Sequence, residues 1–354
     1  MSAPTSVVFT GLGLVLPGAT TVDAARAALE AGLPAFRELP EALGPGRGAP
    51  ADLPPGVIPP MQARRLDRAS RFAWAAAAAA FQDAGLDPRA YEGDRIALAA
   101  GTQTGGSEAS EAFMRPYLQR GPEGASPLLF PNCVANAAGG HVAVAFGLKG
   151  PSATLLEREA ATLAALEQGA RWLHLGLADA VLVLGLDALF PMLFDVLAGA
   201  RLLAREGDPR PDGRSGLLPG EGAQAFLLER EADARARGAR LRARLGALAC
   251  EAPAHPDGDR AAALVQATEA VGGATCARWI RGANGTARLD AAEADLPHLG
   301  LPEAWAPKAL WGEFCGSGGQ LVAAALLQPA PSVLVTAPTS FGAQYALRLD
   351  AVAS

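Results

Sequence analysis

The chain has 354 residues, 50% of them hydrophobic, and a formal net charge of −6 at pH 7. This length can form one large buried core or two domains of ordinary size, so it permits an enzyme fold. The negative charge and the scattered arginines argue against a nucleic-acid-binding protein, because phosphate contacts need clustered Lys and Arg.

The four cysteines, at positions 133, 250, 276 and 315, form neither a CxxC pair nor the dense pattern of a disulfide-rich secreted domain. The first apolar run, 7–16, follows MSAPTS without the basic region of a signal peptide. The longest apolar stretch, 178–204, contains Asp187, Pro191 and Asp195, which predicts a buried strand and helix rather than a membrane span. We therefore expect a reduced, cytoplasmic protein.

Short apolar runs alternate with alanine-rich stretches along the chain, which is typical of an α/β protein whose sheets are covered by helices. Strands are predicted at 7–16, 96–101, 180–184, 224–229, 241–250, 279–281 and 333–337. Helices are predicted at 23–31, 69–84, 137–146, 160–174, 261–271 and 319–327. The segments 41–60 and 207–222 are rich in Gly and Pro and are expected to be loops. The charged segment 229–244 predicts a solvated helix or turn followed by a strand, at a junction between two halves.

Several motifs carry a family resemblance. The most specific is NAAGGHVAVAFGLKGP at 136–151, and the others, in chain order, are VVFTGLGLVLPG, RLDRASRFAWAAAAAAFQDAGLD, ADAVLVLGLDALF, DGRSGLLPGEGA and TSFG. Together they resemble β-ketoacyl synthases and the related chain-length factors. The resemblance implies a thiolase-like, five-layer αβαβα fold built from two pseudo-symmetric βαβαβαββ halves. We assign these halves to 1–235 and 236–354 within one compact unit. It also implies a dimer that acts, without a cofactor, on acyl groups held by an acyl carrier protein.

Members of this family condense acyl groups with a Cys-His-His constellation, and all three of its positions are changed here. Counting from the GPxxT turn, the nucleophile position falls on Glu159. The first histidine position holds Asn284, and the second holds Glu313, although the family lysine is retained as Lys308. A carboxylate is a poor substitute for a thiolate in acyl transfer, and the histidines normally stabilise an enolate oxygen. The chain therefore resembles a degenerate, non-condensing synthase subunit.

Other candidate groups do not restore this chemistry. His141 is expected to be a structural imidazole, and His174, His255 and His298 show no metal-ligand spacing. Cys315 lies in a Gly-rich turn but has no general base beside it in sequence. The family oxyanion motif survives in part at 340–345, where a backbone donor is still conceivable, and Phe341 and Gly342 are expected to contact substrate.

Three functional hypotheses follow. The first is a chain-length-factor-like subunit that pairs with an active ketosynthase, with Phe113, Met114, Tyr117 and Leu118 as a gate for acyl length. An ordinary apolar helix face explains this run equally well.

The second hypothesis is an enzyme with altered chemistry, a malonyl decarboxylase, hydrolase or cyclase that uses Glu159 and Glu313 as acid and base. An ion pair between Glu159 and Lys308 is favoured over that role. The third is a self-associating acyl-binding protein.

Overall fold

Ten strands form one mixed sheet in the computed structural model, which describes residues 6–91, 93–204, 216–255, 258–294, 296–314, 318–340 and 342–352. One half of this sheet has the strand order β5-β4-β6-β7-β1. The strands are β1 (Val7–Val15), β4 (Ile96–Gly101), β5 (Ser152–Leu155), β6 (Ala180–Asp187) and β7 (Gly222–Arg230). Strand β4 pairs in parallel with β5 and β6, whereas β7 is antiparallel to β6 and to β1.

The other half repeats this arrangement in the order β10-β9-β11-β12-β8. Its strands are β8 (Ala243–Glu251), β9 (Arg278–Ile280), β10 (Ala304–Trp305), β11 (Ser332–Ala337) and β12 (Gln344–Asp350). As in the first half, one strand, β9, pairs in parallel with two neighbours, β10 and β11, whereas β12 is antiparallel to β11 and to β8. A short antiparallel ladder between residues 7–9 of β1 and 243–245 of β8 joins the halves. The predicted pseudo-symmetry is therefore present, while the division at residue 235 stays a prediction.

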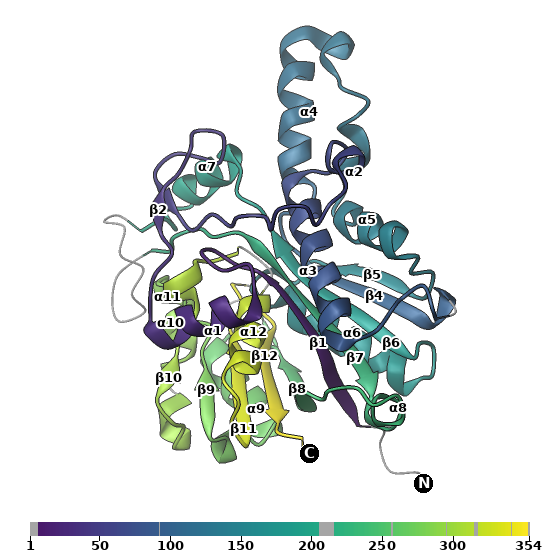
Figure 1. Ribbon diagram of the computed structural model, residues 1–354. Coiled ribbons are helices and arrows are strands. Elements are labelled where there is room, and N and C mark those ends of the chain that lie inside the picture. The colour runs from purple at the N-terminus through teal and green to yellow at the C-terminus, as the bar shows by residue number, and fades with distance from the viewer. Residues whose placement is uncertain are drawn as a thin grey trace.

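Helices complete a five-layer αβαβα arrangement (Figure 1). The outer face of the first half is covered by α3 (Arg68–Ala84) and α5 (Ala137–Phe146), and that of the second by α9 (Arg260–Ala270) and α10 (Ala287–Ala292). Between the two halves lie α6 (Ala161–His174) and α12 (Gly319–Leu327). Alternate residues of the strands enter different cores, as the period of a strand requires. Leu182 and Leu184 join the outer core, for example, and Val181 and Val183 the central one.

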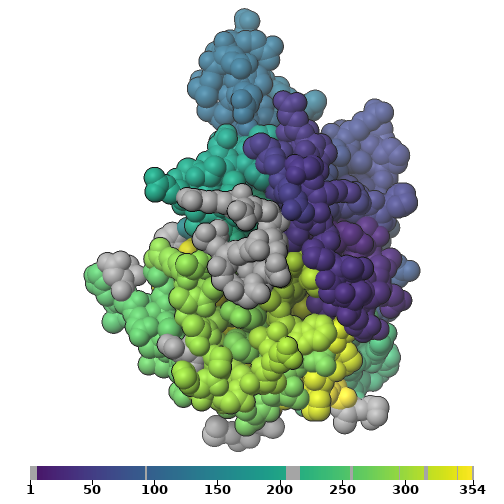
Figure 2. Space-filling view, turned by 90° about the vertical axis from the view of Figure 1, so that its left-hand side faces the viewer, coloured from purple at the N-terminus to yellow at the C-terminus, as the bar shows by residue number. Residues whose placement is uncertain are grey.

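The remaining elements lie mostly at the edges and connections. They are α1 (Val22–Ala31), β2 (Arg37–Glu38), β3 (Arg47–Gly48), α2 (Pro60–Ala63), η1 (Gly93–Arg95), α4 (Ser107–Arg120), η2 (Gly121–Gly124), η3 (Phe130–Asn132), η4 (Arg158–Ala160), α7 (Pro191–Gly199), α8 (Glu231–Ala236), η5 (Gly273–Thr275), η6 (Leu296–Leu299) and α11 (Lys308–Trp311). Helix α4 and the segment after it stand clear of the body of the molecule (Figures 1 and 2). We call residues 107–134 the arm.

Every predicted strand and helix is present, with boundaries that shift by a few residues. The prediction for 229–244 is also confirmed, since α8 is followed by β8. The predicted loop at 41–60 contains only the short β3, whereas 207–215 of the second predicted loop lie outside the described residues. Neither β12 nor α4 is among the predicted strands and helices, although an apolar helix face was one interpretation of the run 113–118. The polar sequence of α4, with Pro116 inside it, weakens its helical period.

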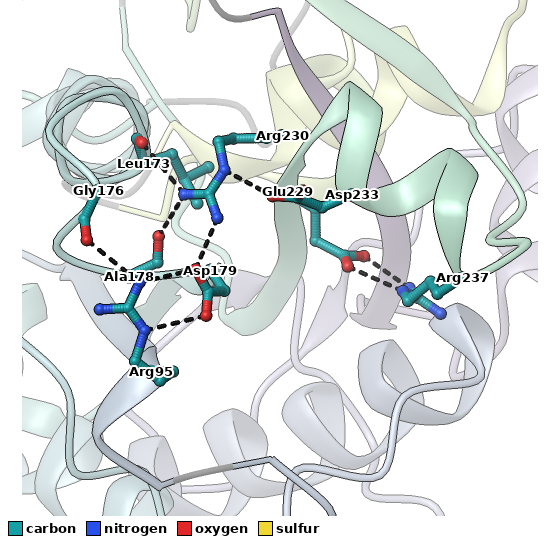
Figure 3. Close-up of polar contacts among 9 residues, drawn as sticks. All are labelled: Arg95, Leu173, Gly176, Ala178, Asp179, Glu229, Arg230, Asp233 and Arg237. Carbon is teal, nitrogen blue, oxygen red and sulfur yellow. Dashed lines mark hydrogen bonds and ion pairs between the residues drawn. The ribbon is translucent and has the colours of Figure 1, made fainter.

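An ion-pair cluster lies at the amino ends of the parallel strands β4 and β6 (Figure 3). Arg95, before β4, donates to both oxygens of Asp179, at 2.9 and 2.7 Å. Arg230, at the end of β7, donates to the same carboxylate at 2.6 Å and to the carbonyls of Leu173 and Ala178. Hydrogen bonds from Arg95, and then from Arg230, lower the pKa of Asp179 to about 2. The cluster thus ties together the ends of three adjacent strands.

Glycines at the carboxyl ends of β4 and β6 let helix α6 begin directly against the sheet. A Cβ atom on Gly101 would lie 2.4 Å from the backbone carbonyl of Ala161, and one on Gly185 would lie 2.3 Å from the Thr162 hydroxyl. Real Cβ atoms do not approach backbone so closely, so only glycine fits at Gly101 without moving the helix. This close packing fixes the position of residue 159, just before α6.

We expect Gly101→Ala to lower the free energy of unfolding by roughly 1–3 kcal/mol, because the new methyl group displaces the first turn of α6. Gly140→Ala is the matched control, since nothing lies within 4 Å of its Cβ position on α5. In a helix this control should raise stability by roughly 0.5–1 kcal/mol. Urea unfolding measures both values, and equal effects of the two substitutions would contradict the packing described.

Candidate functional site

The three positions that the sequence analysis singled out meet near the carboxyl ends of β4, β5 and β6. Open parallel sheets bind ligands in the crevice outside these strand ends, because the loops there converge. Glu159 lies in η4 between β5 and α6, and Asn284 lies after β9. Glu313 follows α11 and reaches the same cavity as Glu159.

Glu159 is buried, with 8% of its surface exposed, and its carboxylate contacts the TSFG turn. Its Oε2 atom accepts hydrogen bonds from the backbone N–H of Ser340 at 3.0 Å and from the Ser340 hydroxyl at 3.1 Å. The preceding residue, Arg158, has a φ of 48°, a left-handed conformation that non-glycine residues rarely adopt. The N–H of Ser340, in the turn considered as a source of a backbone donor, is thus bonded to the Glu159 side chain, and the assignment of Glu159 to the nucleophile position stays a prediction.

Glu313 and Lys308 form a buried ion pair, with Nζ and Oε2 2.7 Å apart and side-chain exposures of 2% and 1%. The amide of Asn284 donates to the same Oε2 atom at 2.8 Å. The expected ion pair between Glu159 and Lys308 is wrong, because the lysine is directed to Glu313. A buried carboxylate next to an ammonium group and an amide donor has its negative charge compensated within the protein.

Asn284 is held rigidly by its own turn. Its Oδ1 atom accepts from the backbone N–H and the hydroxyl of Thr286, at 3.0 and 2.7 Å. The carboxylate of Asp290 accepts from the N–H groups of Asn284 and Gly285. Burial raises the pKa of Asp290, although these hydrogen bonds act in the opposite direction. The side-chain amide of Asn284 therefore has one fixed direction, toward Glu313.

Two cavities meet at Glu159. The first, about 270 Å³, has a largely apolar wall formed by α7 and the segments that flank it. Its lining residues are Gln103, Thr104, Ser107, Arg158, Glu159, Phe190, Met192, Leu193, Val196, Leu197, Leu202, Leu217 and Glu313. The second, about 300 Å³, is lined by Arg158, Glu159, Ala200, Leu202, Leu217, Asn284, Thr286, Arg288, Leu289 and Ser340. Each cavity combines apolar walls with polar groups, and the two share the Glu159 carboxylate.

Asp187, at the end of β6, fixes the loop that borders the first cavity. Its Oδ1 atom accepts from the hydroxyls of Thr102 and Thr104 and from the N–H groups of Gln103 and Thr104, at 2.7–3.1 Å. Complete burial raises the pKa of Asp187 to about 7 despite these donors. In the sequence this residue was only one of the charges that argue against a membrane span and a part of the motif ADAVLVLGLDALF. Its position at the end of a buried apolar strand was the available signal of a site residue.

The gate residues lie on α4, away from the two cavities at Glu159. Phe113 packs against the ring of Phe130, with centroids 5.8 Å apart, while Met114 and Tyr117 are exposed. Ser107 of the same helix does line the first cavity. A gate formed by Phe113, Met114 and Tyr117 would therefore act on a pocket of another subunit, and this role stays a prediction.

Other predicted positions have simpler outcomes. The imidazole of His141 bonds to Oδ1 of Asn132 at 2.7 Å, in agreement with a structural role. Gly342 lies in the turn before β12, where its carbonyl accepts from the Gln344 amide, and a substrate contact there is untested. Phe341 and Cys315 lie outside the described residues.

Within the described ranges, no three His, Cys, Asp or Glu side chains gather as a metal site would require. Among these same ranges, no helix combines the length and apolarity needed to span a membrane.

Sequence comparisons identify the family of the chain. The family model for the β-ketoacyl synthase N-terminal domain matches residues 5–234. The chain is 32% identical over 193 residues to 3-oxoacyl-[acyl-carrier-protein] synthase 2 of Staphylococcus aureus, covering 52% of this chain and 47% of the relative. It is 34% identical over 188 residues to the enzyme of the same name from Synechocystis, covering 51% and 45%. The matched region thus spans about half the length of these curated relatives.

Solved structures show the same fold over nearly the whole chain. One described as the ishigamide ketosynthase/chain length factor has a TM-score of 0.88 at 23% identity and covers 99% of this chain and all of the neighbour. A β-ketoacyl synthase from Burkholderia phymatum has a TM-score of 0.86 at 23% identity with the same coverage. A type II polyketide synthase carrier protein in complex with its ketosynthase gives 0.80 at 18%, covering 98% and 100%. At these identities the structural likeness establishes the fold.

We expect Lys308→Met to lower the free energy of unfolding by about 3–5 kcal/mol, because it leaves the Glu313 carboxylate buried without its counter-charge. The double variant Lys308→Met, Glu313→Gln should lose clearly less than the sum of the two single variants. A double-mutant cycle from urea unfolding measures this difference. Additive losses would show that the two side chains do not stabilise one another.

Proposed function

Because the chain belongs to the β-ketoacyl synthase family, we propose that it is a non-condensing member that pairs with an active ketosynthase. In this pair it shapes the pocket for a growing acyl or polyketide chain, as a chain-length factor does. The pathway would be a carrier-protein-dependent one, of the fatty acid, polyketide or aryl-polyene type. The observation that carries the proposal is the closed contact among Glu313, Lys308 and Asn284 at the two histidine positions.

The nucleophile position does not favour an acyl-enzyme intermediate. A condensing synthase transfers its acyl group to a thiolate, which is both strongly nucleophilic and a good leaving group. Attack by the Glu159 carboxylate would instead form a mixed anhydride, and its Oε2 atom is bonded to Ser340. Loss of these two hydrogen bonds would add to the barrier of such an attack.

The histidine positions do not favour decarboxylation either. An enolate oxygen is stabilised by donors aimed at its developing charge. Here Glu313 is an acceptor, and both Lys308 and Asn284 donate to it rather than to a ligand. A malonyl carboxylate would also approach a second carboxylate at this position, which like charges disfavour.

The arm and the free edge of β5 support a partner of the same fold. Leu118, Leu128 and Phe130 on the arm are 76%, 80% and 64% exposed, and Val144 on the nearby α5 is 85% exposed. Apolar surface of this extent usually marks an interaction site. Strand β5 ends the sheet among the described strands, so its outer edge can pair with a strand of another chain. The ketosynthase neighbours include an assembly with a carrier protein, which supports a carrier protein as a second partner.

A catalytic role for Glu159 and Glu313 has weaker support. The two carboxylates do line one cavity, as an acid–base pair would require. However, each is already bonded to protein donors, and Glu313 has a buried counter-ion. Self-association without a synthase would use the same arm and strand edge, so the partner must be identified by experiment.

Co-expression with an active ketosynthase from the same organism tests the pairing. We expect a one-to-one complex that survives size-exclusion chromatography and forms products from malonyl carrier protein. A stable, soluble homodimer that leaves the synthase free and fully active would contradict the proposal. Synthesis by the chain alone would contradict its non-condensing character.

In the reconstituted pair, we expect Phe113→Ala and Tyr117→Ala to lengthen the product, because smaller side chains on the arm leave more room in the partner's pocket. The distribution of product lengths is measured by mass spectrometry. Gln119→Ala, on the same helix and exposed, is the control and should leave the distribution unchanged. Unchanged lengths for both aromatic variants in an intact complex would exclude the gate.

A further inference from the structure

Helix α7 begins without a cap from its own sequence. The N-cap residue, Phe190, has a hydrocarbon side chain that cannot accept a hydrogen bond, and Pro191, at the first helical position, has no N–H group. The first backbone donor within the helix is therefore the N–H of Met192. It donates to Oε2 of Glu111, on α4, at 3.1 Å. The carboxylate that caps α7 thus comes from the arm, 81 residues earlier in the chain.

Glu111 points toward α7 from a helix whose neighbouring side chains are open to solvent. Its side chain is 10% exposed, whereas that of Arg115, which donates to Oε1 at 2.5 Å, is 63% exposed. An exposed ion pair of this kind contributes little to stability. A carboxylate at the N-terminus of a helix is also favoured by the helix dipole. The bond to Met192 is therefore the contact by which Glu111 joins the arm to the rest of the chain.

A second carboxylate on α4 makes the same kind of contact with α3. Oε2 of Glu108 accepts from the N–H of Arg68, the first residue of α3, at 3.0 Å. Glu108 and Glu111 are three residues apart and so share one face of α4. Helix α3 also has a local cap, because Asp67 accepts from the N–H of Ser70. The base of the arm is thus bonded to the first turns of two helices, and α7 depends on it more than α3 does.

The buried side of α7 belongs to a small hydrophobic cluster that is separate from the larger cores. This cluster consists of Leu189, Phe190, Leu193, Phe194, Leu197 and Leu217. The other side of the helix is open, with Val196 60% exposed. Segments with few buried contacts open at a lower free energy than the whole fold, so the loss of a cap acts locally here.

Both helices border the cavity of about 270 Å³ that reaches Glu159. Ser107, the first residue of α4, lines this cavity, and so do Met192 and Leu193 of α7. The arm itself stands clear of the body, where another molecule can reach it (Figure 1). A movement of α4 that separates Glu111 from Met192 would remove the cap of α7 beside this cavity.

We infer that Glu111 is a latch through which the arm holds α7 in place, and that a molecule bound to the arm changes the cavity wall through this bond. Coupling between two sites acts in both directions, so loss of the latch loosens α4 as well as α7. Glu111 is thus a positioning residue that acts through α7. The latch lies within the chain, and the inference does not depend on the proposed pairing.

Hydrogen–deuterium exchange of the purified chain, read by mass spectrometry, tests the latch. In Glu111→Ala the amides of α7 should exchange roughly three- to tenfold faster than in the wild type, because the helix has lost its cap. The first two turns of α4 should also exchange about twofold faster or more. Alanine is a better helix former than glutamate, so α4 on its own would exchange more slowly in this variant.

Two further variants separate the latch from other effects of the substitution. Glu111→Gln keeps an oxygen that can accept from Met192, and it should restore most of the protection in both helices. Arg115→Ala removes the exposed partner of Glu111 but leaves the bond to Met192, so exchange in α7 should match the wild type. Should Glu111→Ala fail to fold, Glu111→Asp, whose side chain is one methylene shorter, takes its place in the same comparison.

Four results would each overturn the inference. Unchanged exchange of α7 in a folded Glu111→Ala variant would show that α7 does not need this cap. Faster exchange of α7 with unchanged or slower exchange of α4 would show a cap without coupling to the arm. Equal exchange in Glu111→Gln and Glu111→Ala would show that the hydrogen bond is not the connection. Equal effects of Arg115→Ala and Glu111→Ala would assign the change to the surface ion pair.

Discussion

The buried charge of Glu313 is the constraint on which the rest of this site depends. A carboxylate with 2% of its side chain exposed is stable only if protein groups replace its hydration. Lys308 and Asn284 do so, and each is fixed in turn, the lysine by burial and the asparagine by the turn through Thr286 and Asp290. The side chains at these positions are therefore bonded to one another and are not directed toward a substrate.

The fold explains why these groups meet. Two repeats of the same strand order place η4 of the first half and the turns of the second half at one end of the central helix layer. Glycines at the ends of β4 and β6 bring α6 against the sheet, and Gly318 brings the start of α12 against residue 159. The ion-pair cluster of Arg95, Asp179 and Arg230 secures the opposite ends of the same strands (Figure 3). A rigid frame thus holds a site whose polar groups are bonded to each other.

The sequence predicted the fold class and most elements. Val7–Val15 is a continuous apolar run, Ala137–Phe146 is a small-residue apolar stretch that ends at Gly147, and the family motifs fixed their order. Partners across the site were not predictable, because no local pattern shows that Lys308 turns to Glu313 while Glu159 turns to Ser340. Those choices depend on side chains brought together by distant turns. Helix α4 was considered only as one interpretation of the run 113–118, because Pro116 and its exposed apolar residues hide the usual amphipathic pattern.

In the function that we propose, the chain binds and shapes acyl groups in an assembly, and a partner with an intact thiolate forms the bonds. The most direct measurement is the release of labelled CO₂ from malonyl carrier protein by the purified chain in the absence of any synthase. We expect release no faster than in buffer, with no change on Glu159→Gln, because no donor pair faces an enolate oxygen. Sustained release that Glu159→Gln abolishes would contradict this conclusion and make Glu159 a catalytic residue.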